Sequence, residues 1–419
     1  MNKLIIQGGK ILKGTIKASG SKNSSLPILF SSILADGPLI LNNTPHLSDI
    51  STTLRLLMDM GAEFILESDG ALFVDSSKLT NLVADYDLVK TMRASILTLG
   101  PMLAKYGEAK VSLPGGCAIG SRPINLHLQA LKELGATIEV KNGYIFAKAK
   151  KLVGKNIYFD QVSVTATENI IMAATLAEGT TILYNSAKEP EIYDLSTCLN
   201  KMGAKISGIG TSTLTIEGVK HLNGVQYSVC PDRIEVGTYL VAAAITKGSI
   251  TVNGAKAESM KSILEKLTEA GAEITITNNS IKLDMKGKKP KAVNIDTGTY
   301  PNFPTDMQAQ FTALNSIADG SCSITENIFE NRFMHVPELV RMGADLTLEG
   351  NTIVCKGVKL LTGAHLIASD LRASASLVLA GLVAEGETTI DRVYHLDRGY
   401  ETIEEKLKLL GAQIERVQD

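Results

Sequence analysis

The chain has 419 residues, of which 44% are hydrophobic and 21% are charged, so it can form sizeable cores and is long enough for two domains. Its formal net charge of −2 at pH 7 argues against a nucleic-acid-binding surface, which needs a clearly basic face. Any anionic ligand must therefore be held by local groups rather than by the charge of the whole chain.

The N-terminal residues and the apolar stretches predict a protein of the cytoplasm. Residues 1–8 alternate into a glycine turn too early for the apolar region of a signal peptide. The longest apolar run, near residues 377–384, is far below the roughly 20 residues that cross a bilayer, so we expect no membrane span. Widely spaced cysteines without CxxC pairs predict neither a disulfide framework nor a zinc site; they are Cys117, Cys198, Cys230, Cys322 and Cys355.

A Gly-Ala pair closes an amphipathic stretch six times, at intervals of 68 to 74 residues. The residues four and one positions before each glycine are apolar, which is the spacing of a helix with one face inward. We expect each glycine to supply the left-handed cap that ends its helix. The six are Gly61, Gly135, Gly203, Gly271, Gly343 and Gly411.

A second set of six glycines lies 23 to 28 residues before the first set. Runs rich in β-branched residues follow them, which predicts strands. The stretch before each of them is apolar on nearly all sides, as at residues 170–176, and predicts a helix buried inside its domain. We therefore expect six α/β units, each with two helices and several strands, punctuated by Gly37, Gly107, Gly179, Gly248, Gly320 and Gly386.

Charged or capping residues stand where these buried helices are expected to begin. Such an end must face solvent or a cleft, because unpaired buried charge is costly. Cations oppose the dipole at a helix N-terminus, so Lys22, Arg93 and Arg372 indicate a bound anion, whereas Thr165 and Thr167 fit a plain helix cap equally well. The full set is Lys22, Asn23, Lys90, Arg93, Thr165, Thr167, Asp232, Arg233, Asp306, Asp370 and Arg372.

Residues 114–123, PGGCAIGSRP, are the densest irregular segment, with three glycines and two prolines. The segment interrupts the repeat pattern, and we expect a long loop that acts as a lid. Cys117 lies at its centre, five residues before Arg122, where a thiol could serve as proton donor or nucleophile; an inert surface thiol is the alternative. We expect the other four cysteines to pack as small hydrophobic residues.

Other candidate motifs favour structural roles. His127 and His335 occupy core-facing helix positions, where satisfied structural histidines are expected. Gly208-Ile209-Gly210 precedes a strand and predicts a hairpin turn rather than a dinucleotide loop. The sequence has no P-loop lysine and no residues at metal-ligand spacing, so we expect chemistry that needs neither cofactor nor metal.

Seven segments resemble the enolpyruvyl transferases, and the likeness covers the whole chain. The loop that carries Cys117 favours the branch of that family whose acceptor is UDP-N-acetylglucosamine. The segments are GSKN at 20–23, KTMRAS at 90–95, the loop at 114–123, FPTDMQAQ at 303–310, NRFMH at 331–335, DLRA at 370–373 and DRGY at 397–400.

The resemblance implies an inside-out α/β barrel of two domains, with three of the six repeated units in each. Domain 1 is predicted as residues 22–230 and carries the Cys117 loop. Domain 2 is predicted as residues 1–21 together with residues 231–419, and is discontinuous.

The resemblance also implies a reaction. The enolpyruvyl group of phosphoenolpyruvate is transferred to the 3′-hydroxyl of UDP-N-acetylglucosamine, and phosphate is released, in the first committed step of peptidoglycan synthesis. Addition and elimination through a tetrahedral ketal need an acid and a base. By resemblance Cys117 is the acid, a carrier of a covalent phosphoenolpyruvate adduct and the target of fosfomycin, while Asp306 is the base and Lys22 and Arg398 assist.

Both substrates are anions, which suits forked and point-charge donors. The residues expected at phosphoenolpyruvate are Lys22, Asn23, Arg93, Arg122, Arg332, Asp370, Arg372 and Arg398. Those expected at UDP-N-acetylglucosamine are Asn23, Arg93, Arg122, Pro123, Ile124, Asn125, Leu126, Ser163, Val164, Thr165, Asp306 and Ile328. Asn125 and Thr165 differ from the residues that many relatives carry, which bears on the uracil contacts and not on the reaction.

Two other functions stay open. One is an enolpyruvyl transferase that uses shikimate 3-phosphate, against which the cysteine loop argues. The other is a non-catalytic repeat scaffold, against which the retained Cys117 and Asp306 argue. Thiol redox activity would need a second cysteine near Cys117, and the sequence leaves the oligomeric state undecided.

Overall fold

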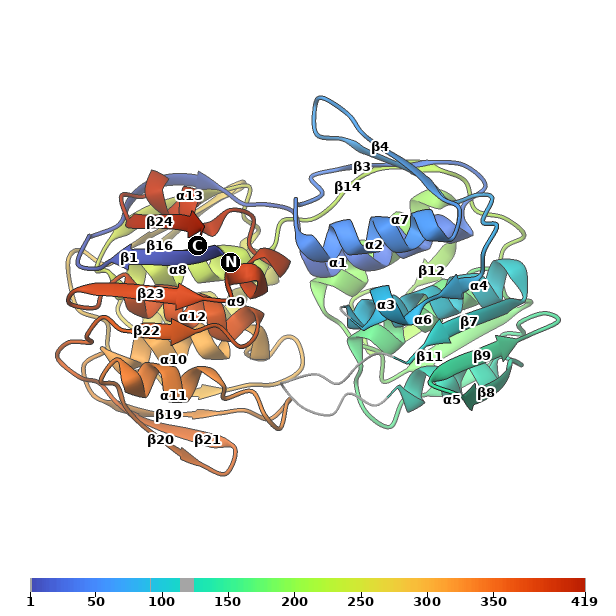
Figure 1. Ribbon diagram of the computed structural model, residues 1–419. Coiled ribbons are helices and arrows are strands. Elements are labelled where there is room, and N and C mark those ends of the chain that lie inside the picture. The colour runs from blue at the N-terminus through green and yellow to red at the C-terminus, as the bar shows by residue number, and fades with distance from the viewer. Residues whose placement is uncertain (1, 91, 114–123, 419) are drawn as a thin grey trace. The chain divides into compact units, whose positions relative to one another are not determined.

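The computed structural model describes residues 2–90, 92–113 and 124–418 (Figure 1). Within that part, the chain forms two compact units. One unit contains residues 2–19 and 231–418, and the other contains residues 20–113 and 124–230. Each unit has its own hydrophobic core. None of the helices in the described part is both long enough and apolar enough to span a membrane.

Six four-stranded sheets in the described residues share one topology. In each, a short strand pairs in parallel with a second strand, the second pairs antiparallel with a third, and the fourth pairs antiparallel with the third at the edge of the sheet. In the unit of residues 20–230 the sheets are β14 (Val225–Ser228), β3 (Leu39–Asn42), β5 (Leu72–Asp75) and β4 (Glu63–Leu66); β6 (Val83–Ala84), β7 (Glu108–Ser112), β9 (Tyr144–Lys148) and β8 (Thr137–Lys141); and β10 (Asn156–Tyr158), β11 (Thr180–Tyr184), β13 (Thr213–Glu217) and β12 (Lys205–Ser207).

The second unit repeats this arrangement three times and includes the N-terminal strands. Its sheets are β2 (Lys13–Lys17), β15 (Ser249–Asn253), β17 (Ser280–Asp284) and β16 (Glu273–Thr277); β18 (Ile295–Asp296), β19 (Ser321–Thr325), β21 (Thr352–Lys356) and β20 (Asp345–Glu349); and β22 (His365–Ile367), β23 (Glu387–Asp391), β1 (Asn2–Gln7) and β24 (Gln413–Gln418). The predicted α/β architecture of six repeated units, three in each half, is thus confirmed.

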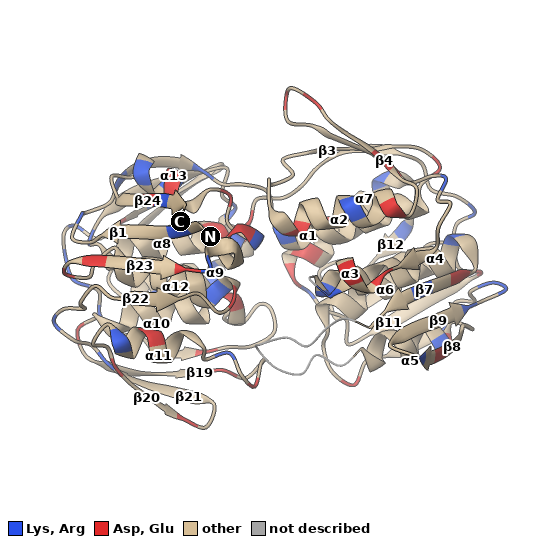
Figure 2. Cartoon of the chain, viewed as in Figure 1, with Lys and Arg blue, Asp and Glu red and all other residues tan. Residues whose placement is uncertain are grey.

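One buried helix per repeat lies inside the unit and its sheet lies outside, which is the inside-out arrangement that the resemblance implied (Figure 1). All nine residues of α10 are buried, and its sequence carries no charge. Figure 2 accordingly shows these helices largely free of charged residues along their length. They are α1 (Lys22–Ser31), α4 (Leu99–Tyr106), α6 (Val164–Ala174), α8 (Arg233–Ile245), α10 (Gln308–Ser316) and α12 (Leu371–Gly381).

The second helix of each repeat is amphipathic and buries one face. In α2, for example, Leu54 and Leu57 are buried while Arg55 is exposed. These helices are α2 (Ser48–Asp59), α5 (Asn125–Glu133), α7 (Pro190–Met202), α9 (Lys261–Glu269), α11 (His335–Arg341) and α13 (Ile403–Leu409). Short helical segments complete the description: α3 (Tyr86–Val89), η1 (Ser32–Leu34), η2 (Arg93–Thr98), η3 (Ala257–Ser259), η4 (Thr305–Met307) and η5 (Val393–Arg398).

The predicted glycine caps are present in all six amphipathic helices. Each glycine of the first set has a positive φ, between 92° and 111°. In every repeat the alanine after the glycine donates its N–H to the carbonyl of the leucine five residues earlier, at 2.9 to 3.1 Å. This is the Schellman arrangement, which satisfies helix carbonyls that would otherwise lack a partner. The same glycine cap therefore ends the amphipathic helix and leads into the next strand in all six repeats.

Two predictions differ from the structure in detail. Lys90 does not stand at the start of a buried helix: it follows the short helix α3, where its ammonium group lies 2.6 Å from Asp87, and the extended backbone of Met92 separates it from η2. Cys198, Cys322 and Cys355 are buried as expected, but Cys230 lies outside any strand, and its sulfur is 3.2 Å from the Ser24 hydroxyl. The hairpin predicted at Gly208 connects β12 and β13.

Replacement of Gly271 by alanine tests the cap. A Cβ at Gly271 would meet no atom within 4 Å, so the cost comes from the backbone φ of 102° alone. We expect Gly271→Ala to lower the free energy of unfolding by about 1–2 kcal/mol, and Gly271→Asn to lower it less, because asparagine tolerates this region better. Chemical denaturation followed by circular dichroism measures both.

Gly61→Ala serves as the comparison. Its φ is similar, but an added Cβ would lie 2.7 Å from the Thr80 hydroxyl, so the loss should be larger than at Gly271. An unchanged stability of Gly271→Ala would contradict the role given to these glycines.

Candidate active site

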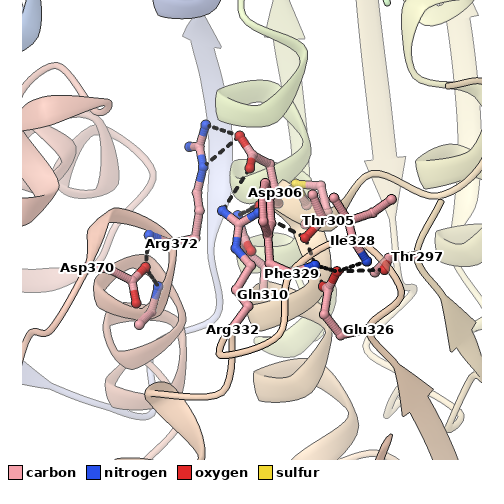
Figure 3. Close-up of polar contacts among 12 residues, drawn as sticks. Thr297, Thr305, Asp306, Gln310, Glu326, Ile328, Phe329, Arg332, Asp370 and Arg372 are labelled. Atoms are coloured by element: carbon pink, nitrogen blue, oxygen red, sulfur yellow. Dashed lines mark hydrogen bonds and ion pairs between the residues drawn. The ribbon is translucent and has the colours of Figure 1, made fainter. Parts of the chain in front are cut away.

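Three segments of the unit of residues 231–418 bring charged side chains together where two buried helices begin (Figure 3). The first is η4, which leads into α10, and the second is the start of α12. The third is the segment of residues 326–332 that follows β19. The predicted residues Asp306, Arg332 and Arg372 therefore meet in one cluster.

Asp306 is the centre of the cluster. Its Oδ1 lies 2.7 Å from a terminal nitrogen of Arg332, and its Oδ2 lies 2.9 Å from a terminal nitrogen of Arg372. The two arginine side chains are 7% and 3% exposed, whereas the Asp306 side chain is 26% exposed. Such charge-assisted bonds are short and strongly oriented. The two arginines and Asp306 together carry a net charge of +1, and the Asp306 carboxylate reaches the surface.

Buried polar groups hold Arg372 from behind. Its Nη1 donates to the Tyr400 hydroxyl at 3.1 Å, and that hydroxyl lies 2.9 Å from the hydroxyl of Thr238. Burial opposes the charge of Arg372, but Tyr400 and the acidic neighbours outweigh it and raise the pKa of the guanidinium above its ordinary value. Arg372 therefore stays a fixed cation.

Arg332 has a hydrogen-bond donor to spare. Its Nη1 donates to the Thr305 hydroxyl at 2.9 Å, and its guanidinium lies 5.3 Å from the ring centre of Phe329. The Nε–H of this 6% exposed residue has no hydrogen-bond partner among the described residues. Buried donors are nearly always paired, so this one suits an oxygen atom of a bound anion.

Two further predicted residues of this unit lie at defined structural positions. Asp370 is the N-cap of α12, and its Oδ1 accepts the backbone N–H groups of Arg372 and Ala373, each at 3.0 Å. Arg398 ends η5, next to Asp397, whose carboxylate is held by Arg416 at 2.7 Å and 3.0 Å. The backbone around both residues is thereby fixed.

In the other unit, predicted residues also stand at helix starts. Lys22 and Asn23 open α1, which is capped by the Ser21 hydroxyl, and the Lys22 ammonium group lies 3.4 Å from Asp49. Arg93 opens η2. Ser163 caps α6, which begins with Val164 and Thr165.

His127, in α5, lies within hydrogen-bond distance of two residues of α6. Its Nε2 lies 3.3 Å from the Thr165 hydroxyl and its Nδ1 lies 3.0 Å from the Asn169 amide. Burial, with a smaller effect from Arg93, lowers the pKa of His127 from 6.5 to about 3. Its interpretation as a satisfied structural histidine agrees with this geometry. His335 is buried too, but its Nε2 has no hydrogen-bond partner within the described ranges, so that histidine is not fully satisfied.

The remaining predicted residues lie in two places. Cys117, Arg122 and Pro123 fall outside the described residues. Ile124 is the N-cap residue of α5, which Asn125 and Leu126 begin, and Ile328 donates its backbone N–H to Glu326 at 2.8 Å. Over the described part of the chain, no three His, Cys, Asp or Glu side chains are grouped closely enough to hold a metal ion.

Sequence reasoning missed the polar groups behind the two arginines. Thr305, Glu326 and Tyr400 hold Arg332 and Arg372 in place, yet none was assigned a role. The available signal was weak. Glu326 directly follows a strand. The sequence alone does not show its hydrogen-bond partner, because Thr305 lies beside it only in the folded chain.

His127→Gln tests the effect of the buried imidazole on stability. Because the pKa of His127 is about 3 in the folded protein and its ordinary pKa is 6.5, the unfolded chain binds a proton between these pH values that the folded protein does not. His127 therefore lowers the free energy of unfolding as pH falls below 6.5, by up to about 1.4 kcal/mol per pH unit, and has no such effect above pH 6.5. His127→Gln should make the dependence of unfolding free energy on pH shallower by about this slope between pH 6 and 4.5.

The exposed His221, changed to Gln, is the control in the same denaturation series. A slope for His127→Gln that matches both the parent and the control would contradict the buried, neutral state of His127.

Comparison with known proteins agrees with the resemblance drawn from the sequence. The family model described as EPSP synthase (3-phosphoshikimate 1-carboxyvinyltransferase) matches residues 6–407. Proteins named UDP-N-acetylglucosamine 1-carboxyvinyltransferase from Ruthia magnifica subsp. Calyptogena magnifica and Vesicomyosocius okutanii subsp. Calyptogena okutanii are 76% and 75% identical to this chain over 419 residues, the whole of each chain.

The fold has a close counterpart among solved structures. The crystal structure of the enolpyruvyl transferase NikO from Streptomyces tendae gives a TM-score of 0.90 at 24% identity, and the match covers 100% of this chain and 99% of that one. This likeness supports the fold alone. With the family match over nearly the whole sequence and relatives identical at three residues in four, the chain belongs to the EPSP synthase family of enolpyruvyl transferases.

Proposed function

We propose that this chain transfers the enolpyruvyl group of phosphoenolpyruvate to the 3′-hydroxyl of UDP-N-acetylglucosamine and releases phosphate, as the first committed step of peptidoglycan synthesis. The structural observation that carries the proposal is the Asp306 carboxylate, partly exposed between two buried guanidinium groups. The substrates follow from the name shared by relatives 76% and 75% identical over the full length. The proposed location of the reaction is the cytoplasm.

The proposed chemistry is an addition followed by an elimination. Asp306 accepts the proton of the 3′-hydroxyl while the sugar oxygen bonds to C2 of phosphoenolpyruvate, and an acid delivers a proton to C3, so that a tetrahedral ketal forms. The ketal then loses phosphate from C2 and a proton from C3, which restores the double bond. Cys117 is the proposed acid. Asp306 acts by position, because two guanidinium groups fix both of its oxygens.

Phosphoenolpyruvate is the proposed partner of the cationic groups. Its carboxylate and phosphate suit the unpaired Nε–H of Arg332 and the fixed guanidinium of Arg372. The other proposed contacts are Lys22, Asn23, Arg93, Arg122, Asp370 and Arg398. For UDP-N-acetylglucosamine we propose Asn23, Arg93, Arg122, Pro123, Ile124, Asn125, Leu126, Ser163, Val164, Thr165, Asp306 and Ile328.

The proposed acid and the proposed base lie in different predicted domains. Residues 22–230 form the domain that carries Cys117, and residues 1–21 with 231–419 form the domain that carries Asp306. A role as a non-catalytic scaffold is the less favoured proposal, since a scaffold has no need of an unpaired buried donor at Arg332 beside a carboxylate that reaches the surface.

Release of phosphate tests the proposed reaction. We expect phosphate only when phosphoenolpyruvate and UDP-N-acetylglucosamine are supplied together, because elimination follows addition. Asp306→Asn should lower kcat by a factor of about 10²–10⁴, the usual contribution of a general base. A coupled colorimetric assay for phosphate measures both, with Asp345→Asn, an exposed strand residue, as the control for the same chemical change.

Three results would contradict this assignment. Turnover with shikimate 3-phosphate in place of the nucleotide sugar would overturn the acceptor. Full activity of Asp306→Asn would remove the base, and full activity of Cys117→Ser would remove the acid.

A further inference from the structure

Glu326 is a buried carboxylate for which the proposed chemistry has no use. It is 3% exposed and follows β19 directly. Its Oε1 accepts the backbone N–H groups of Ile328 and Phe329 at 2.8 Å and 3.1 Å, and the hydroxyl of Thr297 at 2.9 Å. Its Oε2 accepts the hydroxyl of Thr305 at 2.8 Å (Figure 3). Four donors thus fix both oxygens of a side chain that no ligand needs to reach.

The direction of the hydrogen bond from Thr305 follows from the chemistry of its neighbours. Arg332 Nη1 lies 2.9 Å from the Thr305 oxygen, and a guanidinium group can only donate. Thr305 has a single hydroxyl proton, and its oxygen already accepts the bond from Arg332. The proton therefore points to Glu326 Oε2. Two hydrogen bonds thus run in one direction, from Arg332 to Thr305 and from Thr305 to Glu326.

The same arginine makes the ion pair with Asp306. Arg332 Nη2 lies 2.7 Å from Asp306 Oδ1, while its Nη1 is held by Thr305, the residue directly before Asp306 in the chain. Glu326 also holds the backbone of Phe329, whose ring lies against the guanidinium. Glu326 thus holds the Thr305 hydroxyl, which bonds to one edge of the Arg332 guanidinium, and the backbone of Phe329, whose ring lies against the face of that guanidinium.

We propose that Glu326 and Thr305 form a positioning pair that holds Arg332 against Asp306 and thereby sets the orientation of the carboxylate that accepts the proton. The inference rests on the proposed function, because it concerns the same site. Neither member of the pair touches the reacting atoms. The pair acts through Arg332, and a small displacement of such a group can cost a large factor in rate.

Two threonines bonded to the same carboxylate allow a matched test. Thr305→Val is nearly isosteric and removes the hydroxyl shared by Glu326 and Arg332. Thr297→Val removes another hydroxyl bonded to Glu326, at 2.9 Å, and leaves the bond from Arg332 intact. Both changes leave buried groups unpaired and should lower the melting temperature to a similar extent. Only Thr305→Val should lower kcat strongly.

The expected result is a loss of about tenfold to 10²-fold in kcat for Thr305→Val, with KM for UDP-N-acetylglucosamine changed by less than about threefold. Thr297→Val should keep kcat within about threefold of the parent, and Thr305→Ser, which restores the hydroxyl, should do the same. If Thr305→Val does not fold, Glu326→Gln replaces it. Its amide oxygen can still accept the two backbone N–H groups, while its NH₂ group faces Thr305 and deprives that hydroxyl of its acceptor.

Parental kcat in both Thr305→Val and Glu326→Gln, or equal losses of kcat in the two valine variants, would overturn the proposal. Crystal structures of the valine variants give a second readout that does not depend on turnover. We expect the Arg332 guanidinium to leave Asp306 in Thr305→Val and to stay in Thr297→Val. An unmoved Arg332 in both variants would overturn the positioning role. A parent enzyme that releases no phosphate would overturn the proposed function, and the crystal structures of the two variants would then still test the positioning of Arg332.

Discussion

One carboxylate between two buried guanidinium groups is the interaction on which the site depends. Asp306 bonds to Arg332 and Arg372, whose side chains are 7% and 3% exposed. Buried charges of this kind are tolerated only with good geometry and further hydrogen bonds. The structure supplies these from Tyr400 behind Arg372 and from Thr305 beside Arg332. The polar groups around the cluster thus serve both the stability of the buried cations and the orientation of the carboxylate.

The repeat explains how such a cluster arises at the ends of helices that are mostly apolar and buried. Each repeat buries most of one helix, and the charged residues of these helices lie mainly near their ends. Asp370 shows how one helix start serves both the fold and the site. Its carboxylate caps α12 by accepting two backbone N–H groups, and one of these belongs to Arg372, the cation that reaches Asp306. The cap and the site are therefore formed by neighbouring residues of one helix start.

Much of the fold could be predicted from the sequence because its signals are local. A helix that ends at a Gly-Ala pair needs only its own residues, and all six glycines adopt the expected positive φ. Arg372 was predicted because a cation at a buried helix start is unusual, and Asp306 was predicted at another such start. Arg332 was expected only from the resemblance to the enolpyruvyl transferases. Thr305 and Glu326 could not be predicted, because their hydrogen bond joins positions 21 residues apart and depends on the packing of η4 against the end of β19. Lys90 was misplaced because a short extra helix, α3, precedes η2 in this repeat, and Lys90 is the C-cap residue of α3, beside Asp87.

The most direct test of the central claim is a double-mutant cycle between Thr305 and Arg332, read in kcat. The cycle compares the effect of Thr305→Val in the parent with its effect in Arg332→Lys. If Thr305 acts only through the guanidinium that holds Asp306, Thr305→Val should lower kcat in the parent and have little further effect once Arg332 is replaced. An equal factor in both backgrounds would show that Thr305 and Arg332 act independently, and would contradict the account of Asp306 as a carboxylate positioned by its buried neighbours.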